Sequence, residues 1–221
     1  MSCLKKSFSI LLVIIATFNS ITFASSLVRM ETIDSFKQQP MANSISGNLM
    51  EKLFSLNNVK LKLKPNLIFS KGTITGGYVE LLNGISGEKY ASFSVEKCPY
   101  FRAKKLIANT GEEFLFVQAG REFASESSCT GIWLVGLHNG SYVTFATIDT
   151  VKNAGLLYTD ISSSLEDGEL KLLGFTRDRN CVNGQYKGHP AYPIGVADYG
   201  INSTYLFWDE NAQWFGIRKA D

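Results

Sequence analysis

Gly131–Ile148, GIWLVGLHNGSYVTFATI, contains two apolar runs separated by Asn139-Gly140, and this stretch decides the fold class. Asparagine and glycine tolerate the positive φ angles of a two-residue type I′ turn, so the stretch is predicted to form a β-hairpin. A helix is disfavoured because glycine and threonine interrupt both runs. The expected cross-strand pairs are His138–Ser141, Gly136–Val143, Leu134–Phe145 and Ile132–Thr147.

Both faces of this predicted hairpin are apolar. Directly opposed residues share a face, and a hairpin with one face in water should alternate between apolar and polar side chains. We therefore expect the hairpin to be covered on both sides, at the centre of a sandwich or of a sheet with a helix packed on it. One face would carry Ile132, Leu134, Val143 and Phe145, and the other Trp133, Val135, Leu137, Tyr142 and Ala146.

Short strand-like runs with glycine or asparagine turns recur on both sides of the hairpin. Val59–Lys64, VKLKLK, alternates strictly, which is typical of a half-exposed strand whose lysines suit a sheet edge. The lysine row is interpreted as a solvated face, with a patch for an acidic partner as the alternative. The fold class is therefore mostly β, an antiparallel sandwich or barrel-like sheet, with residues 59–221 as a single β-rich domain. Further predicted strands are Leu67–Ser70, Thr73–Leu82, Lys89–Val95, Lys104–Ala108, Glu113–Ala119, Leu156–Ile161, Glu169–Thr176, Thr204–Trp208 and Gln213–Ile217.

Residues 25–58 have a different pattern. Leu27, Met30 and Ile33 are spaced for a helix that Pro40 would end, and a second helical stretch is predicted over Ser46–Leu56. We expect an N-terminal helical segment packed on the β-rich domain. A mobile arm is the alternative, because the apolar residues are few.

Residues 1–24 are predicted to be a cleaved signal peptide. Lys5 and Lys6 precede an apolar run over Phe8–Phe18, and Thr22-Phe23-Ala24 supplies small residues at the cleavage site. The run is shorter than the roughly 20 residues that a membrane anchor needs. We expect an exported protein, periplasmic or extracellular, with no membrane insertion after cleavage.

Charge and cysteine content narrow the classes of partner. Without Lys5 and Lys6, the 22 basic residues fall to 20 and equal the 20 acidic residues, so no nucleic-acid partner is expected. Cys98, Cys129 and Cys181 follow the predicted signal. Spacing alone does not fix connectivity; a Cys129–Cys181 disulfide, which would close the longest loop, is the favoured pairing, and free thiols are the alternative.

The strand pattern stops between Arg177 and Ser203, which is far longer than an ordinary connection. Long loops of this kind often carry function, and tyrosine and arginine are favoured anchors at binding surfaces. A loop that merely covers the core is the alternative. The candidate binding residues are Arg177, Arg179, Tyr186, Lys187, His189, Tyr192 and Tyr199.

No catalytic motif emerges from the chain. The two histidines, His138 and His189, lack partners at metal-ligand spacing, and nucleophile-elbow and phosphate-loop patterns are absent, so neither metal nor cofactor is expected. We expect a non-enzymatic exported protein that binds a protein partner, as an inhibitor or immunity-like neutraliser. The alternatives are a small-ligand or carbohydrate-binding module that stacks ligands on Tyr192, Tyr199 and Trp214, and a secreted hydrolase with an unrecognised site.

Overall fold

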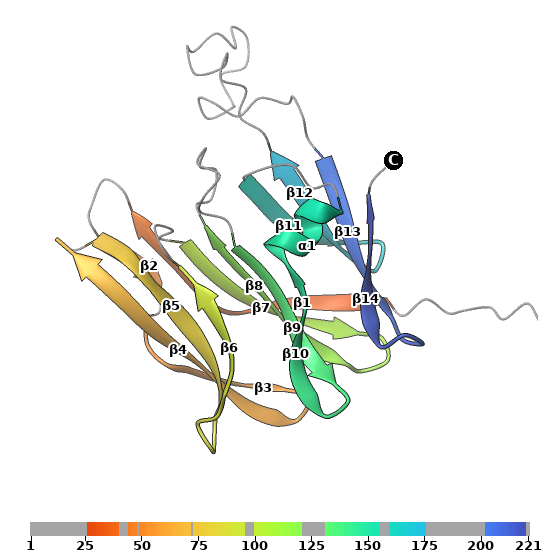
Figure 1. Ribbon diagram of the computed structural model, residues 1–221, viewed down its shortest axis with the longest axis horizontal. Coiled ribbons are helices and arrows are strands. Elements are labelled where there is room, and N and C mark those ends of the chain that lie inside the picture. Colours follow the sequence, from red (N-terminus) through yellow and green to blue (C-terminus); the bar gives the residue numbers. More distant parts are fainter. Residues whose placement is uncertain are drawn as a thin grey trace, which may run out of the picture.

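Six antiparallel strands form the central sheet of the computed structural model (Figure 1). The structure describes residues 26–39, 44–47, 49–71, 73–95, 100–120, 131–154, 160–175 and 202–219. In spatial order the central strands are β10 (Ser141–Thr147), β9 (Gly131–His138), β8 (Glu113–Gly120), β7 (Tyr100–Ala108), β1 (Leu27–Gln39) and β2 (Ser44–Gly47).

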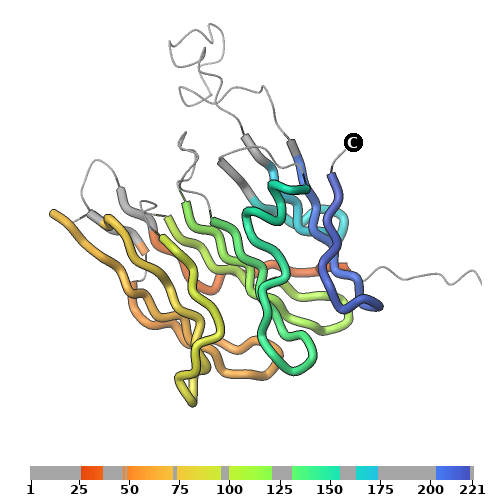
Figure 2. The backbone as a smooth tube through the Cα atoms, viewed as in Figure 1, coloured from red at the N-terminus to blue at the C-terminus, as the bar shows by residue number. Residues whose placement is uncertain are grey.

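Two four-stranded antiparallel sheets cover the two faces of the central sheet, and none of the three closes into a barrel (Figure 2). The first, here called the β3–β6 sheet, contains β3 (Lys52–Leu56), β4 (Val59–Ser70), β5 (Thr73–Asn83) and β6 (Lys89–Ser94). The second, the β11–β14 sheet, contains β11 (Asp160–Glu166), β12 (Glu169–Phe175), β13 (Asn202–Asp209) and β14 (Trp214–Lys219). One short helix, α1 (Ile148–Asn153), follows β10. The predicted mostly β class is confirmed.

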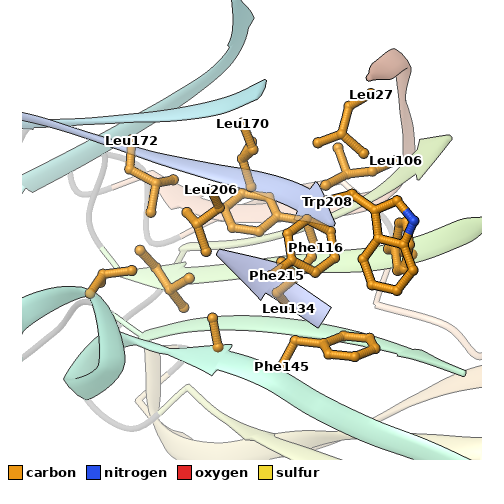
Figure 3. Close-up of a cluster of buried hydrophobic side chains, with 14 of the residues drawn as sticks. Leu27, Leu106, Phe116, Leu134, Phe145, Leu170, Leu172, Leu206, Trp208 and Phe215 are labelled. Atoms are coloured by element: carbon orange, nitrogen blue, oxygen red, sulfur yellow. The ribbon is translucent and has the colours of Figure 1, made fainter. Parts of the chain in front are cut away.

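Strand β8 shows why the molecule has two cores. Phe114 and Phe116 pack toward the β11–β14 sheet, whereas Leu115 and Val117 pack toward the β3–β6 sheet. This is the period-two alternation of a strand whose residues from Phe114 to Val117 are all apolar. Figure 3 shows the core between the central sheet and the β11–β14 sheet, in which Leu134 and Phe145 of the hairpin meet Leu206, Trp208 and Phe215.

The hairpin formed by β9 and β10 has the predicted turn, with positive φ angles at Asn139 and Gly140. Its pairing is as predicted from His138–Ser141 to Gly136–Val143, and both faces are covered. Beyond Thr144 the prediction is wrong by one residue, because a β-bulge at Phe145 pairs Leu134 with Ala146. The bulge also brings Ala146 into the same core as Phe145, instead of the opposite one.

The predicted N-terminal helical segment is wrong, because β1, β2 and β3 occupy most of its described residues. The three-residue spacing of Leu27 and Met30 arises from a bulge between Leu27 and Arg29, the first of two points where the register of β1 against β7 shifts. Leu27 and Met30 consequently face one core, while ordinary strand alternation places Ile33 in the other. A bulge changes the face on which later side chains lie, so a bulged strand reproduces a three-residue apolar spacing.

Candidate functional site

Exposed apolar side chains are concentrated on one of the two outer sheets. Nine large hydrophobic residues are exposed in the described part of the chain, and six of them lie on or next to the β3–β6 sheet. Among the side chains of the β11–β14 sheet that the structure describes, Trp214 is the one in this group. A cluster of exposed apolar residues indicates an interaction surface more strongly than single scattered ones do. The six are Met50, Leu53, Ile68, Phe69, Tyr78 and Ile85.

A hollow of about 870 Å³ lies on the outer face of the β3–β6 sheet. Asn66, Tyr78 and Ser94 stand directly opposite one another on β4, β5 and β6, so their side chains share this face. Ile68 stands opposite Gly76, which has no side chain to fill the space. The remaining lining residues are Leu67, Thr75, Gly77 and Ser92. The hollow therefore joins apolar walls to several hydroxyl groups.

Strand β4 has one unpaired edge beside this hollow. Strand β5 pairs with β4 from Leu61 to Ser70, whereas β3 pairs with it only from Val59 to Leu63. Within the described residues no strand pairs with β4 beyond Leu63 on the side of β3. We call the segment 64–70, with this unpaired side, the open half-edge. Ile68 and Phe69 on it are 63% and 49% exposed.

The direction of the backbone groups along β4 follows from two hydrogen bonds. The carbonyl of Lys60 accepts from Gly84 N at 2.9 Å, and that of Ile68 accepts from Thr75 Oγ1 at 3.3 Å, so both point toward β5. Peptide groups alternate in direction along a strand. The N–H and C=O groups of Leu67 and Phe69 consequently point out of the open half-edge.

Pro65 stands where the pairing with β3 ends. By the same alternation its nitrogen faces the unpaired edge, where no ladder hydrogen bond is lost, and proline inside a sheet is confined to such positions. The sequence predicted a break between Val59–Lys64 and Leu67–Ser70, but β4 continues through Pro65. Edge prolines also discourage unwanted strand pairing.

The open half-edge is flanked by cations. Lys62 is paired with Glu51 at 3.0 Å and Lys89 with Glu80 at 3.7 Å. For Lys64 and Lys71, at the two ends of the half-edge, the described residues supply no carboxylate within 4.0 Å. The local charge is therefore positive and incompletely neutralised.

A buried polar cluster lies between the central sheet and the β11–β14 sheet. Lys104, which is 6% exposed, donates from Nζ to Ser163 Oγ at 3.1 Å and to the Ser163 carbonyl at 3.5 Å. Ser163 Oγ donates to Gln118 Oε1 at 3.5 Å. Burial, reinforced by the positive charge of Arg102, lowers the pKa of Lys104 to about 8. We interpret this cluster as a polar link between two layers.

Trp214, which the sequence offered as a stacking platform, is 41% exposed on β14. Its ring packs edge-on against His138 and Phe145, with centroids 5.4 Å and 4.8 Å apart. His138 Nδ1 lies 3.1 Å from the carbonyl of Gln213. The histidine therefore joins the hairpin tip to the β13–β14 turn.

Most residues singled out from the sequence lie outside the described residues. These are Arg177, Arg179, Tyr186, Lys187, His189, Tyr192 and Tyr199, together with Cys98, Cys129 and Cys181. Among the described residues, no three His, Cys, Asp or Glu side chains are grouped so that they could hold a metal ion. Across the same residues, no helix is long and apolar enough to cross a membrane.

Sequence reasoning missed the open half-edge. Its one signal is the sequence PNLIFS, a proline followed by an apolar run, directly after the lysine row. In comparisons with known proteins, no family model, no curated protein and no solved structure matches this chain.

Proposed function

We propose that this chain is an exported, non-enzymatic binding protein that acts on a protein partner through the outer face of the β3–β6 sheet. One observation carries the proposal: among the described residues, six of the nine exposed large apolar side chains lie on this sheet or next to it, and two of them, Ile68 and Tyr78, line the hollow on its outer face. Protein interfaces have apolar centres with polar rims. The lysines of β4 provide a cationic rim and suit a partner with acidic residues.

Export is part of the proposal and is supported by the basic and apolar pattern of residues 5–24. An inhibitor or immunity-like neutraliser remains the functional class that we propose. The loop 177–203 is a further candidate contact region on the strength of its tyrosines and arginines alone.

Paired variants of exposed side chains test the surface. Ile68 and Val28 are both β-branched, lie on strands and are 63% and 59% exposed, but Val28 belongs to the central sheet. We expect a protein retained by the wild-type chain from the exported fraction to be retained by Val28→Ser and lost by Ile68→Ser/Tyr78→Ser. Removing interface anchors costs about 2 kcal/mol, or roughly thirtyfold in affinity. Retention of the same proteins by all three chains would contradict the proposal.

A small-ligand site is the second candidate, and the composition of the hollow favours it. The exposed ring of Tyr78 stands between Asn66 and Ser94, and Asn66 Nδ2 donates to Glu80 Oε2 at 2.9 Å. An aromatic ring beside amide, hydroxyl and carboxylate groups suits a carbohydrate. Quenching of tyrosine fluorescence by a panel of soluble oligosaccharides, abolished in Tyr78→Ser and retained in Val28→Ser, would support this second function. No quenching by any member of the panel would argue against it.

A further inference from the structure

We infer that the partner enters as an extended strand that pairs with the open half-edge of β4 and continues the line of β3. The inference rests on the proposed function, because it specifies how the same surface is used. The segment added would be short: residues 66–70 span roughly 17 Å at about 3.4 Å per residue. Strand addition obtains affinity from main-chain hydrogen bonds and specificity from alternate side chains.

The backbone of β4 is arranged for this pairing. Leu67 and Phe69 each direct an N–H and a C=O out of the half-edge, on the side where β3 ends at its pair with Leu63. Exposed N–H and C=O groups on a sheet edge form a template for another strand. Pro65 has no N–H group, so this template lacks a donor at its start. The register of a partner strand would therefore be set by the N–H and C=O groups of Leu67 and Phe69.

Side chains on both faces of β4 indicate what such a strand contains. Ile68 is exposed on the outer face, whereas Phe69, exposed by half, and the partly buried Leu67 lie toward the inner face. Residues of an added strand would lie beside Ile68 on one face and beside Leu67 and Phe69 on the other. A long apolar side chain next to Ile68 would lie beside the β4 side of the hollow, which Asn66 and Ile68 line. The centre of the partner segment is therefore apolar on both faces.

Charge decides between a partner and a second copy of the chain. In an antiparallel pair of two β4 strands, Leu67 of one copy would stand opposite Phe69 of the other, because these residues direct N–H and C=O groups out of the edge. Lys64 of one copy would then lie next to Lys71 of the other at each end of the pair, and like charges brought together across strands are destabilising. The same lysines attract acidic residues at the two ends of a foreign strand, since the described residues leave both without a carboxylate partner. The occupant is therefore an extended peptide with acidic flanks.

Hydrogen exchange tests the inference directly. The probe is the synthetic peptide acetyl-Glu-Thr-Val-Phe-Val-Thr-Glu-amide, added to the protein at ten times its measured Kd. We expect the amide exchange of Leu67 and Phe69 to slow by about tenfold, as mass action predicts. One control peptide replaces both glutamates with lysines, and another carries N-methyl groups on the backbone amides that would pair. Both controls should leave the exchange of Leu67 and Phe69 unchanged.

Each other outcome has a distinct meaning. Absence of protection at Leu67 and Phe69 with every peptide would overturn strand addition. If the acidic peptide shifts only the resonances of Tyr78 and Ser94, the outer face binds the peptide as proposed, but strand addition to β4 is overturned. Equal protection by the lysine-flanked peptide would overturn the acidic partner. Protection that grows with protein concentration, without peptide, would identify a second copy as the occupant and overturn the inference.

Discussion

Ser163 Oγ lies 3.1 Å from Nζ of Lys104, so a buried ammonium group joins β11 to the central sheet. The hydrogen bonds to Ser163 partly compensate the loss of water around the lysine. A charged group in such a place favours its neutral form, and this preference becomes measurable as a dependence of stability on pH.

Lys104→Met should change that dependence. The pKa of Lys104 is lowered from 10.5 to about 8 by burial and by Arg102. Between these values the unfolded chain binds more protons than the folded one, so stability rises with pH. From pH 8 to 10.5 the free energy of unfolding of the wild type should therefore rise relative to that of Lys104→Met, by at most about 1.4 kcal/mol per pH unit. Urea unfolding of both proteins over this range measures the rise. A difference between the two free energies that does not change with pH would contradict the prediction.

Thr204→Val should stabilise the protein. Thr204 is fully buried, and its Oγ1 has no hydrogen-bond partner among the described residues. An unsatisfied buried hydroxyl costs about 1–3 kcal/mol, and valine keeps the shape without that group. The expected gain is about 1 kcal/mol in the free energy of unfolding, measured by urea titration. Ser203→Ala, at the neighbouring half-buried position, is the control and should change stability little. A loss of stability in Thr204→Val would show that the hydroxyl has a partner.

Gly136→Ala should destabilise the hairpin. A Cβ at Gly136 would lie 2.6 Å from Phe114 Cδ1 and 2.9 Å from Phe145 Cε2. Both rings are held by contacts with Phe215, so they have little room to move. Overpacking of this kind costs about 1–3 kcal/mol. Thr144→Ala, at an exposed position on β10, should cost less than about 0.5 kcal/mol. Equal thermal midpoints for the two variants would contradict the expected crowding.

Leu115→Ala and Phe116→Ala test whether the three layers unfold together. The two residues are neighbours on β8 but lie in different cores. Each substitution should cost about 2–5 kcal/mol because it leaves a cavity. A shared central sheet predicts a single unfolding transition for both variants, seen by circular dichroism and tryptophan fluorescence alike. Two separated transitions in either variant would show that one outer sheet unfolds by itself.

Pro65→Val should increase self-association. The substitution adds an N–H to the open half-edge, so it extends the row of unpaired donors. Sedimentation velocity should detect dimers or larger species at concentrations where the wild type has none. Ser94→Val adds apolar surface to the same sheet without changing the edge, and it should remain like the wild type. Equal association in both variants would attribute the effect to surface hydrophobicity instead.

The two-sided hairpin and the mostly β class follow from the sequence because they depend on local patterns. Asn139-Gly140 specifies its turn, and apolar residues on both faces require two covering layers. The bulge at Phe145 did not follow, since nothing in the local pattern distinguishes a bulged pair from a regular one. The same holds for β1, where a bulge after Leu27 places Leu27 and Met30 on one face at a spacing that resembles a helix.

The candidate site was harder to predict than the fold. The open half-edge exists because β3 ends opposite Leu63 while β4 continues to Ser70, and that relation involves two strands rather than one. Sequence patterns give the period of each strand but not the length over which two strands pair. The loop after Thr176, by contrast, is recognisable from the sequence because its length and composition are properties of one continuous segment.

The burial of every residue from Phe114 to Gly120 has a consequence for how this protein can diverge. Each outer sheet has a solvent face on which substitutions can accumulate independently. Strand β8 has none, so a volume change at Leu115 must be matched by the β3–β6 sheet, and one at Phe116 by the β11–β14 sheet. Homologues that vary in their binding surface should therefore retain an apolar β8 of nearly constant volume.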